Sequence, residues 1–220
     1  MRTLPKSQRL ARNVDVGAGA VRCVALLRGV NVGTANRIAM AELRTLFENL
    51  GYQDVCTILN SGNVVFTVPS GATGDQAARM EKAIAERLGM RLRVIVLTRK
   101  EVAAALEDNP LTSVAEDPSR LLVLAFADPT HMAPLAPLQK ERWIPEALAV
   151  GKRVAYLWCA RGVGISRLWT MVNRAIGDTG TARNVTTMTR ILATLDSVTL
   201  APVRTGTSRA SPSRRAGGRS

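Results

Sequence analysis

Polar and basic side chains gather in two short segments of the first half of the chain, where they could bind an anion. One segment follows an apolar run and the other is a short turn, and together they contain Arg28, Asn31, Asn36, Arg37, Ser61 and Asn63. A guanidinium group can bind a carboxylate or a phosphate through two parallel hydrogen bonds. Since a charged hydrogen bond contributes about 1.5–3 kcal/mol, two of them would support weak but selective binding. The alternative is structural: asparagines cap turns, and Arg28 tethers one loop to another.

Two further candidates come from the second half. Ser166 opens a helical stretch, where its hydroxyl and the helix amides could hold an oxyanion. It could equally be an N-cap, typically worth about 1 kcal/mol. Arg183 precedes Asn184, which we expect to cap the last helix. We expect Arg183 either to bridge the two halves or to contact a ligand.

The sequence gives little support for catalysis. The single histidine, His131, lies in a proline-rich segment without a recognisable motif. Neither Ser61 nor Ser166 has a general base beside it in the sequence. There is no P-loop, dinucleotide fingerprint or metal-ligand spacing, so we expect no cofactor and no metal. An enzyme of unknown reaction that uses the same pocket stays an alternative.

The elements that would position these residues follow the order β-α-β-β-α-β in the first half. The apolar periodicities predict strands at Val21–Leu27, Val55–Leu59, Val64–Val68 and Leu92–Leu97, and helices over 40–50 and about 77–88. This order is the ferredoxin-like split. Its first and second strands run in the same direction, so the loop after each should lie at the same end of the sheet. We therefore expect Arg28, Asn31, Asn36 and Arg37 to face Ser61 and Asn63 there.

The second half reads as a βαββα-like α+β variant with extra helices. Thr98 and Glu101 predict a capping box, and the helix they begin should stop at Asn109–Pro110. Further strands are expected at Leu121–Ala127 and Val154–Cys159, with an uncertain one within Trp143–Val150, and 177–180 is expected to be a loop. We expect a ferredoxin-like subdomain over 20–110 and a second α+β subdomain over 111–200. Residues 1–19 and 201–220 should be disordered basic extensions.

The net charge of +13 raises nucleic acid as an alternative partner. Residues 203–220 alone contribute five arginines and no acid, so much of the charge belongs to the tails. RNA-binding versions of the ferredoxin-like topology stack bases on aromatics of the central strands, where Phe66 is the single aromatic here. Three isolated cysteines suggest reduced core residues of a cytoplasmic protein. No apolar run approaches about 18 residues, so no membrane span is expected, and the sequence defines no oligomeric state.

Several blocks resemble the bacterial family described as domain of unknown function 1697. The matching residues are Leu26–Gly33, Asn36, Met40–Leu43, Ser61–Phe66, Asn109–Pro110, Gly164–Leu168 and Thr181–Asn184. The resemblance implies a two-part α+β fold with a ferredoxin-like first half, and it implies no activity. The chain departs from the family at Thr34–Ala35, where Gly-Lys is usual, and at Ala39, where lysine is usual. The loss of these two lysines weakens a phosphate site drawn from this loop alone.

Overall fold

The first half of the chain folds in the predicted order. The computed structural model describes residues 19–31 and 37–197. The elements are β1 (Val21–Leu27), α1 (Met40–Asn49), β2 (Gln53–Ile58), β3 (Asn63–Val68), α2 (Gln76–Leu88) and β4 (Val94–Thr98). The α+β class is thus confirmed, with strand boundaries shifted by one or two residues.

These strands form one antiparallel sheet in the order β2-β3-β1-β4. Strand β1 is central and its last five residues are buried, as its continuous apolar run predicts. Leu26 lies opposite Asn63, and the Leu27 N–H donates to the Gly62 carbonyl at 2.8 Å. The expectation that the loop after β1 and the β2–β3 turn share one end of the sheet is therefore confirmed.

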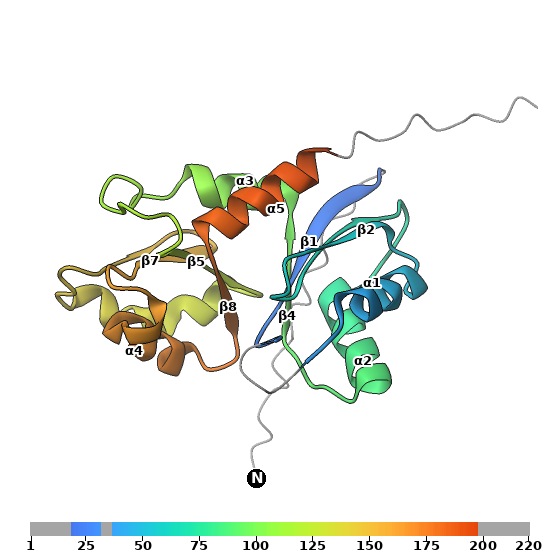
Figure 1. Ribbon diagram of the computed structural model, residues 1–220, viewed down its shortest axis with the longest axis horizontal. Helices are drawn as coiled ribbons and strands as arrows, with labels where there is room; N and C mark the ends of the chain where they lie inside the picture. Colours follow the sequence, from blue (N-terminus) through green and yellow to red (C-terminus); the bar gives the residue numbers. More distant parts are fainter. Residues whose placement is uncertain (1–18, 32–36, 198–220) are drawn as a thin grey trace, which may run out of the picture.

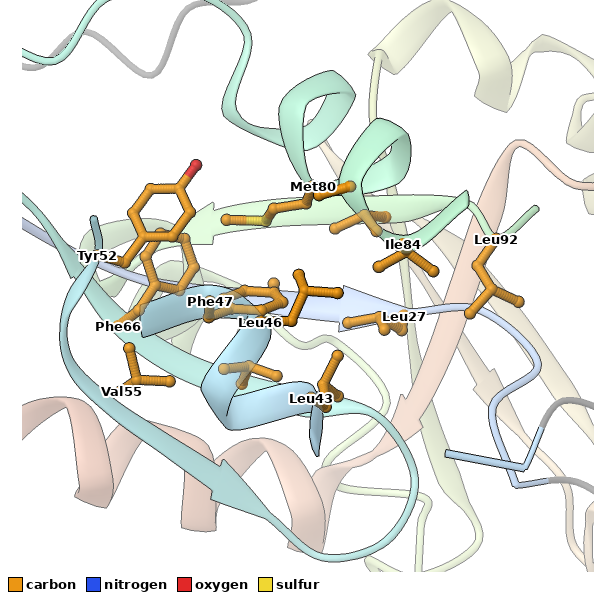
Figure 2. Close-up of a cluster of buried hydrophobic side chains, with 14 of the residues drawn as sticks. Leu27, Leu43, Leu46, Phe47, Tyr52, Val55, Phe66, Met80, Ile84 and Leu92 are labelled. Atoms are coloured by element: carbon orange, nitrogen blue, oxygen red, sulfur yellow. The ribbon is translucent and has the colours of Figure 1, made fainter. Parts of the chain in front are cut away.

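Helices α1 and α2 cover one face of this sheet (Figure 1). The apolar stripe of α1 packs onto β3 through Phe47, whose ring centroid lies 5.7 Å from that of Phe66. Tyr52 completes the aromatic group at 4.7 Å from Phe66, and Met80 and Ile84 approach from α2 (Figure 2). This aromatic and aliphatic core fixes the α1 side of the sheet.

The second half repeats the strand arrangement of the first. The elements after β4 are α3 (Arg99–Glu107), β5 (Leu121–Phe126), the 3-10 helices η1 (Pro129–Leu135) and η2 (Leu138–Lys140), β6 (Ala147–Val150), β7 (Val154–Trp158), the 3-10 helix η3 (Val163–Ile165), α4 (Arg167–Ile176), β8 (Gly180–Asn184) and α5 (Val185–Ser197). The four strands of this half form an antiparallel sheet in the order β6-β7-β5-β8. The sequence did not predict β8, whose first residue was assigned to a loop. Strand β8 exists because it pairs with β5, since its own residues have little β propensity.

Helices α3 and α5 lie side by side and join the two sheets (Figure 1). Helix α5 contacts β1 and β3 of the first sheet and β5 and β8 of the second. A core cluster lies between the two sheets. It contains Val24 and Val65 from the first sheet, Val123 and Tyr156 from the second, and Met188 from α5. The face of the first sheet opposite α1 and α2 is therefore buried inside the molecule.

The predicted caps are confirmed. Thr98 and Glu101 form the reciprocal capping box that begins α3. The Asn184 side chain accepts the Thr187 N–H at 2.8 Å and so caps α5. One prediction about the cysteines is wrong: Cys23 and Cys159 are buried, but Cys56 is exposed, because it lies on the outer strand β2, whose side chains alternate between core and surface. None of the described helices has the length and apolarity to span a bilayer.

Gly180→Ala is expected to destabilise the fold. A Cβ at Gly180 would lie 2.9 Å from the Phe126 ring and 3.1 Å from the Ala125 carbonyl oxygen. Such overpacking in a well-packed core costs roughly 1–3 kcal/mol. Urea denaturation followed by circular dichroism should show this loss of unfolding free energy. The control is Gly164→Ala, where an added Cβ meets no atom within 4 Å; an equal loss in both variants would contradict the packing argument.

Candidate functional site

The structure brings Arg183 into contact with the loop end of the first sheet. Its Nε donates to Asn63 Oδ1 at 2.5 Å, and its Nη2 donates to the carbonyls of Leu27 at 2.8 Å and Ser61 at 2.9 Å. Its Nη1 donates to Thr181 Oγ1 and to the Ala182 carbonyl. All five guanidinium N–H groups are therefore engaged. Arg183 bridges the two halves, which is one of the two roles expected from the sequence.

Asn63 is the partner that fixes this bridge on the side of the first sheet. Its side chain is fully buried, and its Nδ2 donates to the Ile58 carbonyl at 2.9 Å and to Ser61 Oγ at 3.0 Å. Its Oδ1 accepts from Arg183. Asn63 and the Ser61 hydroxyl therefore hold the β2–β3 turn in shape. In this structure Asn63 and Ser61 therefore have a structural role, which is the alternative to ligand binding given in the sequence analysis.

Arg28 also reaches across to the second half. Its Nη1 donates to the Gly180 carbonyl, and its Nη2 donates to Asn173 Oδ1 at 2.8 Å. Burial lowers the pKa of Arg28, and the negative charge of Asp178 acts in the opposite direction. The sequence analysis missed Asn173 and Gly180, because no local pattern connects residues about 150 positions apart.

Asn31 closes the first loop on itself. Its Oδ1 accepts the Ile38 N–H at 3.0 Å, and its Nδ2 donates to the carbonyls of Ile38 at 3.1 Å and Asn60 at 2.8 Å. Asn31 has a φ of 55°, a left-handed conformation that asparagine tolerates better than most residues. The clamp brings the loop and the β2–β3 turn together. Asn36, also predicted to be part of the site, lies outside the described residues.

A surface hollow lies where this loop meets the beginning of α1. Its volume is about 520 Å³ and its lining contains two predicted site residues, Asn31 and Arg37, together with Ile38, Ala39, Met40 and Asn60. Helix α1 begins after Ala39 without a side-chain cap. The first amides of a helix have no intrahelical acceptor, so they are free to bind an anion or water. Position 39 is alanine and not one of the usual capping residues Ser, Thr, Asp or Asn. This is the sequence signal that could have predicted an uncapped start of α1.

Ser166 lies apart from this hollow. Its Oγ accepts the Trp169 N–H at 2.9 Å, which confirms the N-cap interpretation, and its side chain is buried. Burial raises the pKa of the nearby Cys159 thiol, and the Ser166 hydroxyl acts in the opposite direction. From Ser166 to Asn173, the α4 residue that binds Arg28, the helix rises by roughly 10 Å. Ser166 therefore serves the start of α4.

The loop end of the first sheet carries positive charge with mainly neutral partners. Burial lowers the pKa of Arg183 to about 10, so its guanidinium is protonated at neutral pH. The hydrogen-bond acceptors of Arg183 and Arg28 are carbonyls, amide oxygens and one hydroxyl. Within the described residues, Asp178 is the acidic group that acts on the charge of Arg28.

The structure gives no surface for base stacking on the first sheet. Phe66 is fully buried and packs against α1. The opposite face of that sheet is covered by α3, α5 and the second sheet. Residues 203–220, which carry the basic tail, lie outside the described residues. Within 19–31 and 37–197, no three His, Cys, Asp or Glu side chains are grouped closely enough to hold a metal ion.

The comparisons with known proteins agree with this fold. Residues 21–156 match the family described as protein of unknown function (DUF1697). A solved structure of the conserved bacterial protein SP0830 from Streptococcus pneumoniae is similar to this chain, with a TM-score of 0.62 and 24% identity. The match covers 80% of this chain and 99% of that one, and at this identity it speaks for the fold alone. A comparison with the curated proteins finds no significant match.

Arg183→Met should distinguish the stability contributed by the hydrogen bonds of the guanidinium from the stability contributed by packing of the side-chain stem. Methionine retains an apolar stem but leaves the Asn63 Oδ1 and the Leu27 and Ser61 carbonyls without their donor. We expect a loss of about 2–4 kcal/mol in unfolding free energy. Arg183→Lys should recover less than half of it, because a point charge cannot reproduce the planar fork.

Urea denaturation measures both variants, with Arg190→Met on the exposed surface of α5 as the control. If Arg183→Met and Arg190→Met unfold at the same urea concentration, the bridge has no role in stability.

Proposed function

This chain belongs to the DUF1697 family of proteins of unknown function, and within that family we propose that it binds a small anionic ligand, such as a phosphate ester or a carboxylate. The proposed site is the hollow between the first loop and α1. The observation that supports it best is the uncapped start of α1 at Ala39, in the lining that also contains Arg37. Helix N-terminal amides and guanidinium groups both bind phosphate and carboxylate oxygens.

The neighbouring residues suit this role in different ways. Asn31 shapes the hollow, since its amide already holds Ile38 and Asn60. Arg37 is exposed at the rim and brings positive charge. Ala39 and Met40 provide apolar surface, which would contact an organic portion of the ligand. A ligand with one anionic group and a small apolar body fits these features better than a bare inorganic ion.

The partly buried arginines, Arg28 and Arg183, would act at a longer range. Arg28 and Arg183 hold the two halves together and add positive potential behind the hollow, because most of their partners are neutral. Glu42, in the first turn of α1, opposes an anion. The proposal therefore predicts opposite effects for the removal of Arg37 and of Glu42.

Anion titrations with two variants test this function. The probes are inorganic phosphate, phenyl phosphate and benzoate at constant ionic strength, followed by NMR shifts of the backbone amides of residues 37–42. Arg37→Gln should weaken phenyl phosphate binding roughly tenfold or more, which corresponds to one charged hydrogen bond. Glu42→Gln should tighten it about two- to fivefold, the scale of a charge effect at a helix N-terminus.

The control is Arg44→Gln, which removes the same charge from the exposed side of α1, where Arg44 pairs with Glu48 at 2.8 Å. It should leave the affinity nearly unchanged. Equal losses for Arg37→Gln and Arg44→Gln would indicate general electrostatic attraction. No shift of residues 37–42 with any probe at millimolar concentration would reject the site.

A further inference from the structure

Strand β6, one of the two edge strands of the second sheet, has an unpaired edge. It pairs with β7 alone, and the hairpin is closed by the Gly151 N–H donating to the Val154 carbonyl at 2.8 Å. Because the hydrogen bonds of an antiparallel pair alternate, this places the N–H and C=O of Leu148 and Val150 on the side away from β7. No backbone group elsewhere in the described chain bonds to them. In the described residues these groups thus have no backbone partner, and η2 is the element besides β7 that contacts β6 most.

The edge strand β2 of the first sheet is protected against pairing with another chain in ways that β6 is not. On β2, the register shifts between Gln53 and Cys56, and the exposed residue between them, Asp54, has a φ of 49°. A charge and a bulge are the usual devices that stop an edge from pairing with another chain. Strand β6 has the sequence Ala-Leu-Ala-Val and an unbroken register with β7. It therefore carries neither device.

Exposed apolar side chains flank the start of β6. Ile144 is 71% exposed and Ile165 is 74% exposed, the highest values among the large apolar residues of the described chain. They belong to neighbouring segments, since Glu146 Oε2 accepts the Leu168 N–H at 3.0 Å and the Arg167 guanidinium lies 5.6 Å from the Trp143 ring centroid. Exposed apolar residues of this kind mark interaction surfaces when they gather together.

We propose that β6 pairs antiparallel with β6 of a second copy of this chain, which joins the two second sheets into one continuous sheet across a two-fold axis. The axis would pass beside Ala149. Leu148 would then exchange hydrogen bonds with Val150 of the second copy, and the reverse pair would form by symmetry. The flanking isoleucines would lie at the margin of the new interface.

The charges that flank β6 favour a second copy of this chain as the partner that pairs with its free edge. Glu146 and Lys152 each lie three residues from Ala149, one on either side. A two-fold axis at Ala149 therefore brings each Glu146 opposite Lys152 of the other copy, twice per dimer. Pairing about Leu148 would instead place Glu146 opposite Val150, without a charge partner. An unrelated extended peptide would have no reason to match both charges.

Light scattering with size-exclusion chromatography, over protein concentrations from micromolar to millimolar, tests the self-association. The full chain should shift from monomer to dimer. Lys152→Glu places four carboxylates at the interface and should weaken the dimer at least tenfold. Lys100→Glu, an equal charge change on the exposed surface of α3, is the control and should dimerise like the parent. A monomer throughout this range, or equal loss in both variants, overturns the proposal.

Disulfide trapping tests the register. In a Cys56→Ser background, Ala149→Cys should give a covalent dimer on mild oxidation, because residues facing each other in a non-hydrogen-bonded pair lie about 4.5 Å apart at Cα, within disulfide range. Ala147→Cys should not, since the residue opposite would be Gly151. Crosslinking of Ala147→Cys at the same rate, or of neither variant, overturns the register. Circular dichroism confirms that each variant is folded.

Discussion

The guanidinium of Arg183 fixes how the second half of the chain meets the end of the first sheet. A guanidinium removed from water needs an acceptor for each of its five N–H groups, and here carbonyl and side-chain oxygens of both halves provide them. These acceptors include the end of β1 and the β2–β3 turn, so both are held at fixed positions. Asn31, four residues after the end of β1, bonds to Ile38 and to Asn60 of the β2–β3 turn. Asn31 and Asn60, which line the hollow beside α1, are therefore linked to the segments that Arg183 holds.

The two halves are variations on one arrangement. In each, the second strand of the outer hairpin lies beside the first strand of the unit, and the last strand closes the other side. In each, the last residue of that closing strand caps the helix that follows: Thr98 begins α3 and Asn184 begins α5. These two helices pack together and share one apolar core with both sheets. The two halves are therefore joined by equivalent units, each made of a closing strand, a capping residue and the helix that follows. The sequence shows no repeat because the core requires only apolar character at these positions.

The sequence predicts what is local and periodic. The stripe Leu43, Leu46 and Phe47 gives α1, and the Thr98–Glu101 spacing gives the start of α3. Strand β8 was missed because Gly-Thr-Ala-Arg-Asn has no apolar alternation, and pairing with β5 decides its conformation. The topology also correctly placed Arg28 and Asn63 at one end of the first sheet. The partners of these side chains lie up to 152 residues away, and no local signal identifies them.

The distribution of hydrogen bonds decides where at that end a ligand would fit. Asn63 and Arg183 use their donors on each other and on nearby backbone, and Arg28 binds Gly180 and Asn173. A ligand that displaced these bonds would also have to replace the contacts that hold the two halves together. The amides at the start of α1 carry no such structural duty, because a helix end exposed to water exchanges one acceptor for another at little cost. In the proposed function, Arg28 and Arg183 therefore hold the two halves in place, and a ligand would bind at the exposed rim around Arg37.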